Sequence, residues 1–139
     1  MPRIFFIIAA CSAFIAVAAG AFGAHGLRGK LDPELLAVFE LAVRYQMYCA
    51  LALIGVSFAG TQWPGKFINA GGWLLVIGSL LFSGSLYLLS LTGIKGLGAI
   101  TPIGGVLLLA GWLCLAIGAF KSSRRGMTSK ASSVRRVSL

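Results

Sequence analysis

The chain has 139 residues, of which 58% are hydrophobic and only 11% are charged. A soluble domain carries about 25% charged residues, so the composition excludes an ordinary soluble domain and indicates an integral membrane protein. The net charge of +9 does not indicate a nucleic-acid partner, because half of the twelve basic residues follow Phe120, outside the apolar part of the chain.

Four apolar segments are each long enough to cross a membrane. A bilayer core of about 30 Å requires roughly 20 helical residues, and the segments at about 4–24, 35–59, 67–91 and 97–120 meet this requirement. Together they occupy nearly all of residues 1–120. The sequence therefore predicts an all-α membrane protein, in which four transmembrane helices form one compact antiparallel bundle.

The first segment ends with the sequence GAFGAHGL, which contains His25, the single histidine of the chain. We expect the helix to end at Gly26, so the imidazole lies at the membrane boundary. Two interpretations stay open. Water satisfies the imidazole there, or His25 is a ligand or proton carrier, since ionisable groups in or near the membrane are functional candidates.

The second helix is expected to begin before the membrane core. Asp32 and Pro33 are typical of the N-cap and the first position of a helix. Glu40 and Arg44 follow at a spacing of four residues, which allows an ion pair on the helix surface. The alternative interpretation assigns this pair to a proton relay.

Small residues recur every seven positions in three of the four segments. This spacing keeps one face of a helix against its neighbour, and small residues let membrane helices approach closely. We define the packing seams by these positions and expect them to face other helices. They are Ala9, Ala16 and Gly23; Gly71, Gly78 and Ser85; and Gly104, Gly111 and Gly118.

The charge distribution predicts the topology. Juxtamembrane lysines and arginines mark the cytoplasmic side. Arg3, Lys66 and the basic residues after Phe120 outnumber those in the other two connections, so both termini are expected in the cytoplasm. Residues 121–139 are polar and basic, and we expect a disordered cytoplasmic tail near anionic lipid.

This topology places several polar residues at a similar depth in the outer half of the bundle. Polar groups within a membrane are functional candidates, although serines also serve as small packing residues that bond to the preceding helical turn. The candidate polar cluster consists of His25, Glu40, Arg44, Gln46, Ser83, Ser85 and Thr101.

Enzyme chemistry is not indicated. The three cysteines lie singly in apolar stretches, without metal or redox spacing, and phosphate-binding and dinucleotide-binding motifs are absent from the sequence. The three acidic residues fall between Asp32 and Glu40. We therefore expect no catalytic residues, no metal site and no cofactor.

Four motifs in order carry a resemblance to one known family: GAFGAHGL, YQMY followed by ALAL, LFSGSLYLLSLTG, and TPIGGVLLLAGW. Over about residues 4–120 the chain resembles the YgdD/YwdK family of small bacterial inner-membrane proteins. The resemblance implies a multi-pass protein of the bacterial plasma membrane with four spans. It implies no activity, because the family is a domain of unknown function.

Two functions are compatible with the sequence. The first is an accessory or structural membrane protein, which contacts membrane lipids and assembles with itself or with a larger membrane complex. The alternative is a small oligomeric channel or proton-coupled transporter that uses the candidate polar cluster. Four spans are few for an enclosed path within one chain, so the alternative requires an oligomer.

Overall fold

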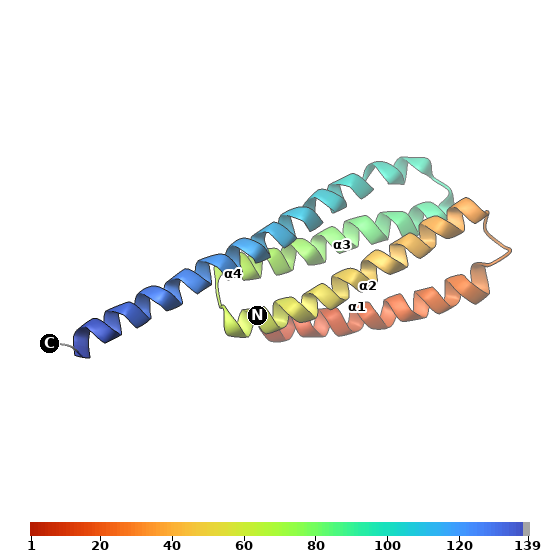
Figure 1. Cartoon of the computed structure of the whole chain (residues 1–139). Helices are drawn as coiled ribbons and strands as arrows, with labels where there is room; N and C mark the ends of the chain where they lie inside the picture. Colours follow the sequence, from red (N-terminus) through yellow and green to blue (C-terminus); the bar gives the residue numbers. More distant parts are fainter. Residues whose placement is uncertain (138–139) are drawn as a thin grey trace.

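The structure, a computed structural model, describes residues 1–137, with side chains described through Ser122. The described chain contains helices and no strands, which confirms the expected all-α fold (Figure 1). The elements are α1 (Pro2–Phe22), a π-helical turn (Gly23–Leu27), α2 (Pro33–Gln62), α3 (Lys66–Thr92), a 3-10 turn (Lys95–Ala99) and α4 (Thr101–Val137).

Four helical segments are long and apolar enough to cross a membrane. They are Pro2–Leu27, Pro33–Gln62, Lys66–Thr92 and Lys95–Ser122. The expectation of four membrane-spanning helices is therefore confirmed by length and composition. The orientation with both termini in the cytoplasm stays a prediction, as does the disordered tail at 121–139, whose side chains lie largely outside the described residues.

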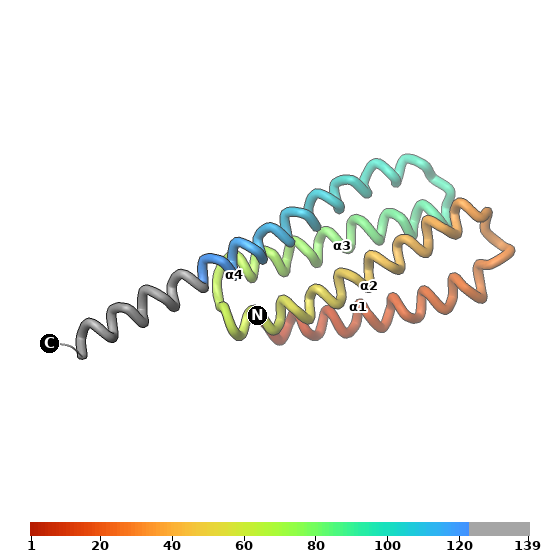
Figure 2. Tube along the Cα trace, in the orientation of Figure 1, coloured from red at the N-terminus to blue at the C-terminus, as the bar shows by residue number. Residues whose placement is uncertain are grey.

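The helices pack in chain order. Each helix lies against the next one, with the most extensive contact between α3 and α4, and Figure 1 shows α1 and α4 at the outer positions. The turn between α2 and α3 lies at the same end as the N-terminus, and the other two connections lie at the opposite end (Figure 2). The arrangement is thus a row, in which α1 and α4 share no extensive contact within the described residues.

One apolar core joins all four helices of this row. Phe5 of α1, Leu53 of α2 and Leu75 of α3 are almost completely buried, and Leu108 of α4 packs into the same cluster. The Phe5 ring reaches α3, where it meets the Trp73 ring edge-on with a centroid separation of 5.6 Å.

The helix ends explain how the first hairpin turns. The first helical segment does not end at Gly26, because a π-helical turn continues it to Leu27, whose buried side chain anchors the turn against the bundle. The chain then reverses at Gly29, where a φ of 81° suits a residue without a Cβ atom. α2 begins after Asp32 as expected, although the Asp32 carboxylate makes no capping hydrogen bond.

All nine seam positions are buried in the structure. The seams of α3 and α4 face each other, since a Cβ atom on Gly71 would lie 3.0 Å from the carbonyl oxygen of Gly111. A Cβ atom on Gly104 would collide with the backbone nitrogen of Phe82. In the π-helical turn after α1, a Cβ atom on Gly23 would lie 3.0 Å from the Phe39 ring of α2. The seams therefore serve contacts within the chain.

Substitution at Gly104 tests the closest of these contacts. We expect Gly104→Ala to lower the free energy of unfolding by about 1–3 kcal/mol, because an added methyl group overpacks the contact with the Phe82 backbone. Gly84→Ala is the matched control, since a Cβ atom there meets nothing within 4 Å. Thermal unfolding in detergent measures both variants. Equal stability of the two would contradict the close contact.

Candidate functional site

The Gln46 side chain of α2 ties three helices together. Its Nε2 donates a hydrogen bond to the backbone carbonyl of Ser12 in α1 at 3.2 Å. Its Oε1 accepts a hydrogen bond from the Tyr87 hydroxyl of α3 at 2.7 Å. Both polar ends of the amide are therefore satisfied by neighbouring helices, and Gln46 acts as a cross-link between α1, α2 and α3.

Tyr87, the partner of Gln46 on α3, is not a member of the candidate polar cluster. Its ring meets Phe39 of α2 edge-on at a centroid distance of 5.0 Å, and its carbonyl accepts a hydrogen bond from Ser90 at 2.8 Å. About two turns earlier on the same helix, Ser79 is hydrogen-bonded to the Cys49 thiol of α2. The helical spacing of the polar residues at 79, 83, 87 and 90 is the signal that points to this face.

A second tie joins α3 to α4. The hydroxyl oxygens of Ser85 and Thr101 lie 2.8 Å apart, and the Ser85 hydroxyl also donates to the carbonyl of Phe82 at 3.0 Å. A serine hydroxyl has one proton, so Thr101 is the donor to Ser85 when Ser85 bonds to Phe82. The structure thus brings these two members of the candidate cluster together.

Ser83 lies on α3 one turn before Tyr87 and is buried, yet its hydroxyl has no hydrogen-bond partner. A buried hydroxyl without a partner costs about 1–3 kcal/mol relative to a satisfied one. The expected alternative, a hydrogen bond to the preceding helical turn, is not formed. Ser83 is therefore a buried polar group that contributes no hydrogen bond among the described residues.

The ionisable members of the candidate cluster lie apart from these ties. His25, Glu40 and Arg44 are all exposed at the end of the bundle near the first hairpin turn. His25 Nδ1 lies 3.1 Å from the carbonyl oxygen of Ala21, its own preceding turn, and the assigned tautomer decides whether it donates. Glu40 and Arg44 line a shallow hollow of about 280 Å³ between α1 and α2, and His25 does not line it.

The expected ion pair between Glu40 and Arg44 is not formed among the described residues. Arg44 Nε instead donates to the backbone carbonyl of Glu40 at 3.4 Å. Exposed pairs at this spacing gain little, about 0.3–0.5 kcal/mol, so a nearby backbone carbonyl competes effectively. The candidate cluster is consequently divided into hydrogen-bonded ties between helices and exposed charges at one end.

The remaining reactive side chains form no further constellation in the described part of the chain. No three histidine, cysteine or acidic side chains there lie close enough to hold a metal ion. Cys11 is exposed, Cys49 is buried and Cys114 is half-buried, and all three are free thiols.

The Gln46 cross-link predicts a stability difference between two tyrosine variants. We expect Tyr87→Phe to destabilise the protein by about 0.6–1.7 kcal/mol, the range of interhelical hydrogen bonds in membranes. Tyr48→Phe is the control, because the exposed Tyr48 hydroxyl makes no hydrogen bond among the described residues. Thermal unfolding of both variants in the same detergent provides the measurement, and equal melting temperatures would refute the cross-link.

Two serine variants are expected to change stability in opposite directions. Ser83→Ala removes a buried hydroxyl without a partner, so it should leave the melting temperature unchanged or raise it. Ser85→Ala removes the tie to Thr101 and should cost about 0.5–1.5 kcal/mol. Both changes delete one oxygen from the same helix, so each controls for the other. A larger loss in Ser83→Ala would show that its hydroxyl is satisfied.

Comparison with known proteins places the chain in a family. Residues 19–105 match a family described as a protein of unknown function (DUF423). A UPF0382 membrane protein of Staphylococcus saprophyticus is 52% identical over 120 residues, which cover 86% of this chain and 98% of that protein. The UPF0382 membrane protein YwdK of Bacillus subtilis is 46% identical over 120 residues, with the same coverage of both chains. No solved structure gives a significant match. The expected resemblance is confirmed, and the chain belongs to the family of UPF0382 membrane proteins that includes YwdK.

Proposed function

We propose that this multi-pass membrane protein is an accessory or structural protein of the bacterial plasma membrane, with no catalytic activity of its own and with both termini in the cytoplasm. The observation that carries the proposal is the use of polar groups within the spans. Gln46 and Tyr87 bond to each other, and so do Ser85 and Thr101. These side chains hold helices together, so they are not available to a substrate.

The outward faces supply the surface for assembly in this proposal. The seams are occupied within the chain, so a partner would contact the exposed apolar side chains of the outer helices. Phe14 of α1 is 77% exposed, and Leu109 of α4 is 72% exposed. A second copy of the chain or a larger membrane complex would cover such side chains, and lipid covers them otherwise.

The division of the candidate polar cluster weighs against a channel or proton-coupled transporter. Proton transfer across a membrane requires a chain of ionisable or hydrogen-bonded groups. His25, Glu40 and Arg44 stay at one end, and among the described residues no hydrogen bond or ion pair joins their side chains to Gln46 or Ser85. An accessory role requires no such chain.

Crosslinking and flux measurements together test the proposal. A photoreactive amino acid at Phe14 or Leu109 should give a discrete protein adduct in native membranes, whereas the same group at the buried Leu75 should give none. Reconstituted liposomes should show no proton flux above protein-free liposomes.

Two results would overturn the proposal. The first is pH-dependent flux in the wild-type protein that His25→Ala or Glu40→Gln abolishes, since this would support the transporter alternative. The second is the absence of any protein adduct at both outward positions, because an accessory protein must contact its complex. Expression and thermal stability of every variant serve as the control for folding.

A further inference from the structure

A long apolar groove lies between α2 and α4, with α3 beneath it. Two neighbouring hollows of about 540 Å³ and 440 Å³ form the groove, and both are lined by Tyr48 and Trp112. Ala52, Gly55 and Ala59 of α2 line the larger hollow. A Cβ atom on Gly55 would meet nothing within 4 Å, which shows that the groove is open space beside that helix.

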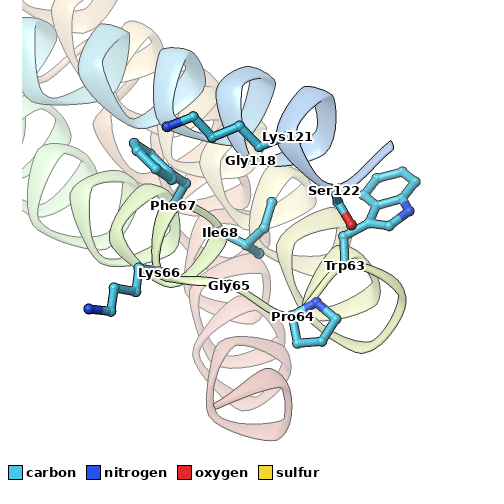
Figure 3. Close-up of a pocket in the computed structure, with 9 residues that line it drawn as sticks. All are labelled: Trp63, Pro64, Gly65, Lys66, Phe67, Ile68, Gly118, Lys121 and Ser122. Carbon is cyan, nitrogen blue, oxygen red and sulfur yellow. The ribbon is translucent and has the colours of Figure 1, made fainter. Parts of the chain in front are cut away.

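The groove leads to a cleft at one end of the bundle. This cleft has a volume of about 450 Å³ and shares Trp63 and Ile68 with the groove. Figure 3 shows Trp63 beside Ser122 on one side of the cleft, and the Lys121 side chain over Phe67 on the other. The apolar space between the helices therefore opens into a cleft beside the turn between α2 and α3, with Lys66 and Lys121 in its lining.

The charge at this end is entirely positive among the described residues. Lys66 and Lys121 line the cleft, and Lys66 extends from its rim away from the bundle (Figure 3). Arg3 lies at the same end, because Pro2 contacts the end of α2 at Gly60. The three carboxylates of the chain lie near the start of α2, at the opposite end.

Among the described residues, no carboxylate neutralises the lysines of the cleft. The Lys121 ammonium lies 4.2 Å from the centroid of the Phe67 ring, a cation–π contact that leaves its charge uncompensated. The first turn of α3 starts in the cleft after Gly65 and has no side-chain cap. Its free N–H groups add to the positive potential. The cleft is therefore complementary to an anion, and the groove behind it to an apolar chain.

We propose that the cleft and the groove form a binding site for one anionic glycerophospholipid. The phosphate lies at Lys66 and Lys121, and one acyl chain lies in the groove between α2 and α4. The site goes beyond the proposed accessory function, which requires no bound lipid. A second copy of the chain is a poorer occupant. A two-fold axis along the membrane normal would bring the same lysine-bearing ends together, and like charges across an interface repel.

Tryptophan quenching tests the proposal on the full chain in phosphatidylcholine nanodiscs. Phosphatidylglycerol with brominated acyl chains is added at a low mole fraction, and brominated phosphatidylcholine at the same fraction is the comparison lipid. One variant retains Trp112, which lines the groove, and the other retains Trp73, which packs against Phe5. We expect several-fold stronger quenching of Trp112 by the anionic lipid. Trp73 should be quenched equally by both lipids.

Charge variants test the headgroup end of the site. Lys66→Gln combined with Lys121→Gln should lower the apparent affinity for phosphatidylglycerol, read from the concentration dependence of Trp112 quenching, about thirtyfold, since each lysine near anionic lipid contributes about fivefold in affinity. Lys95→Gln is the matched control, because Lys95 is exposed at the other end of α3 and α4. If the control variant lost as much affinity for phosphatidylglycerol, the lipid would be attracted by general surface charge and not by a specific binding site.

A groove variant tests the acyl-chain end. Gly55→Leu places a side chain in the groove, where a Cβ atom meets nothing within 4 Å, and should reduce quenching of Trp112 by both lipids. Gly84→Leu, also in open space, is the control and should leave quenching unchanged. The proposal is overturned if the two lipids quench Trp112 equally. This comparison is made on the protein with an unmutated groove. The proposal is also overturned if Gly55→Leu dissociates a dimer, because a second copy then fills the groove. Neither result bears on the flux and crosslinking tests.

Discussion

α3 and α4 approach so closely at Gly104 that a single methyl group would meet the backbone of Phe82. This approach sets the position of α4, since Gly71 and Gly111 continue the same contact along both helices. It also brings Thr101 within hydrogen-bonding distance of Ser85. Lipid tails are as apolar as the helices, so close packing and hydrogen bonds, more than hydrophobic burial, hold the transmembrane row together.

The same contact leaves space elsewhere. Because α4 lies tightly on α3, it does not close against α2, and the groove lined by Tyr48 and Trp112 stays open. On the other side of α2, Gln46 draws α1 and α3 together through Ser12 and Tyr87. The two sides of the row therefore differ in kind, with hydrogen-bonded packing on one side and an open apolar groove on the other.

Much of this fold is predictable from the sequence, because span length and the positions of small residues are properties of single helices. Gly71 and Gly111 each belong to a series of small residues that repeats every seven positions, and both are buried against a neighbouring helix. The polar partners are harder to predict, since they depend on how each helix is rotated about its axis. Gln46 bonds to Tyr87, 41 positions away, which no local pattern specifies.

Local structure also determines the surroundings of His25. The sequence indicates a helix end at Gly26, but a π-helical turn carries the helix to Leu27 and leaves His25 exposed beside Ala21. A π-helical turn depends on the burial of Leu27 and on the Phe22 ring, which leaves no room for a Cβ atom at Gly26. The burial of Leu27 is a tertiary contact, which helix propensity does not report, whereas the Phe22 ring is a local neighbour one turn away.

The packing of each helix on its predecessor has a consequence for biogenesis. Contacts between chain neighbours have low contact order, which favours rapid assembly. The Gln46 cross-link uses only α1, α2 and α3, so its hydrogen bonds can form without α4. Since α1 and α4 do not pack extensively on each other, the packing of the first helix of the chain does not require the last helix. The row can therefore mature stepwise from its N-terminus, with α4 added last onto a platform of three helices.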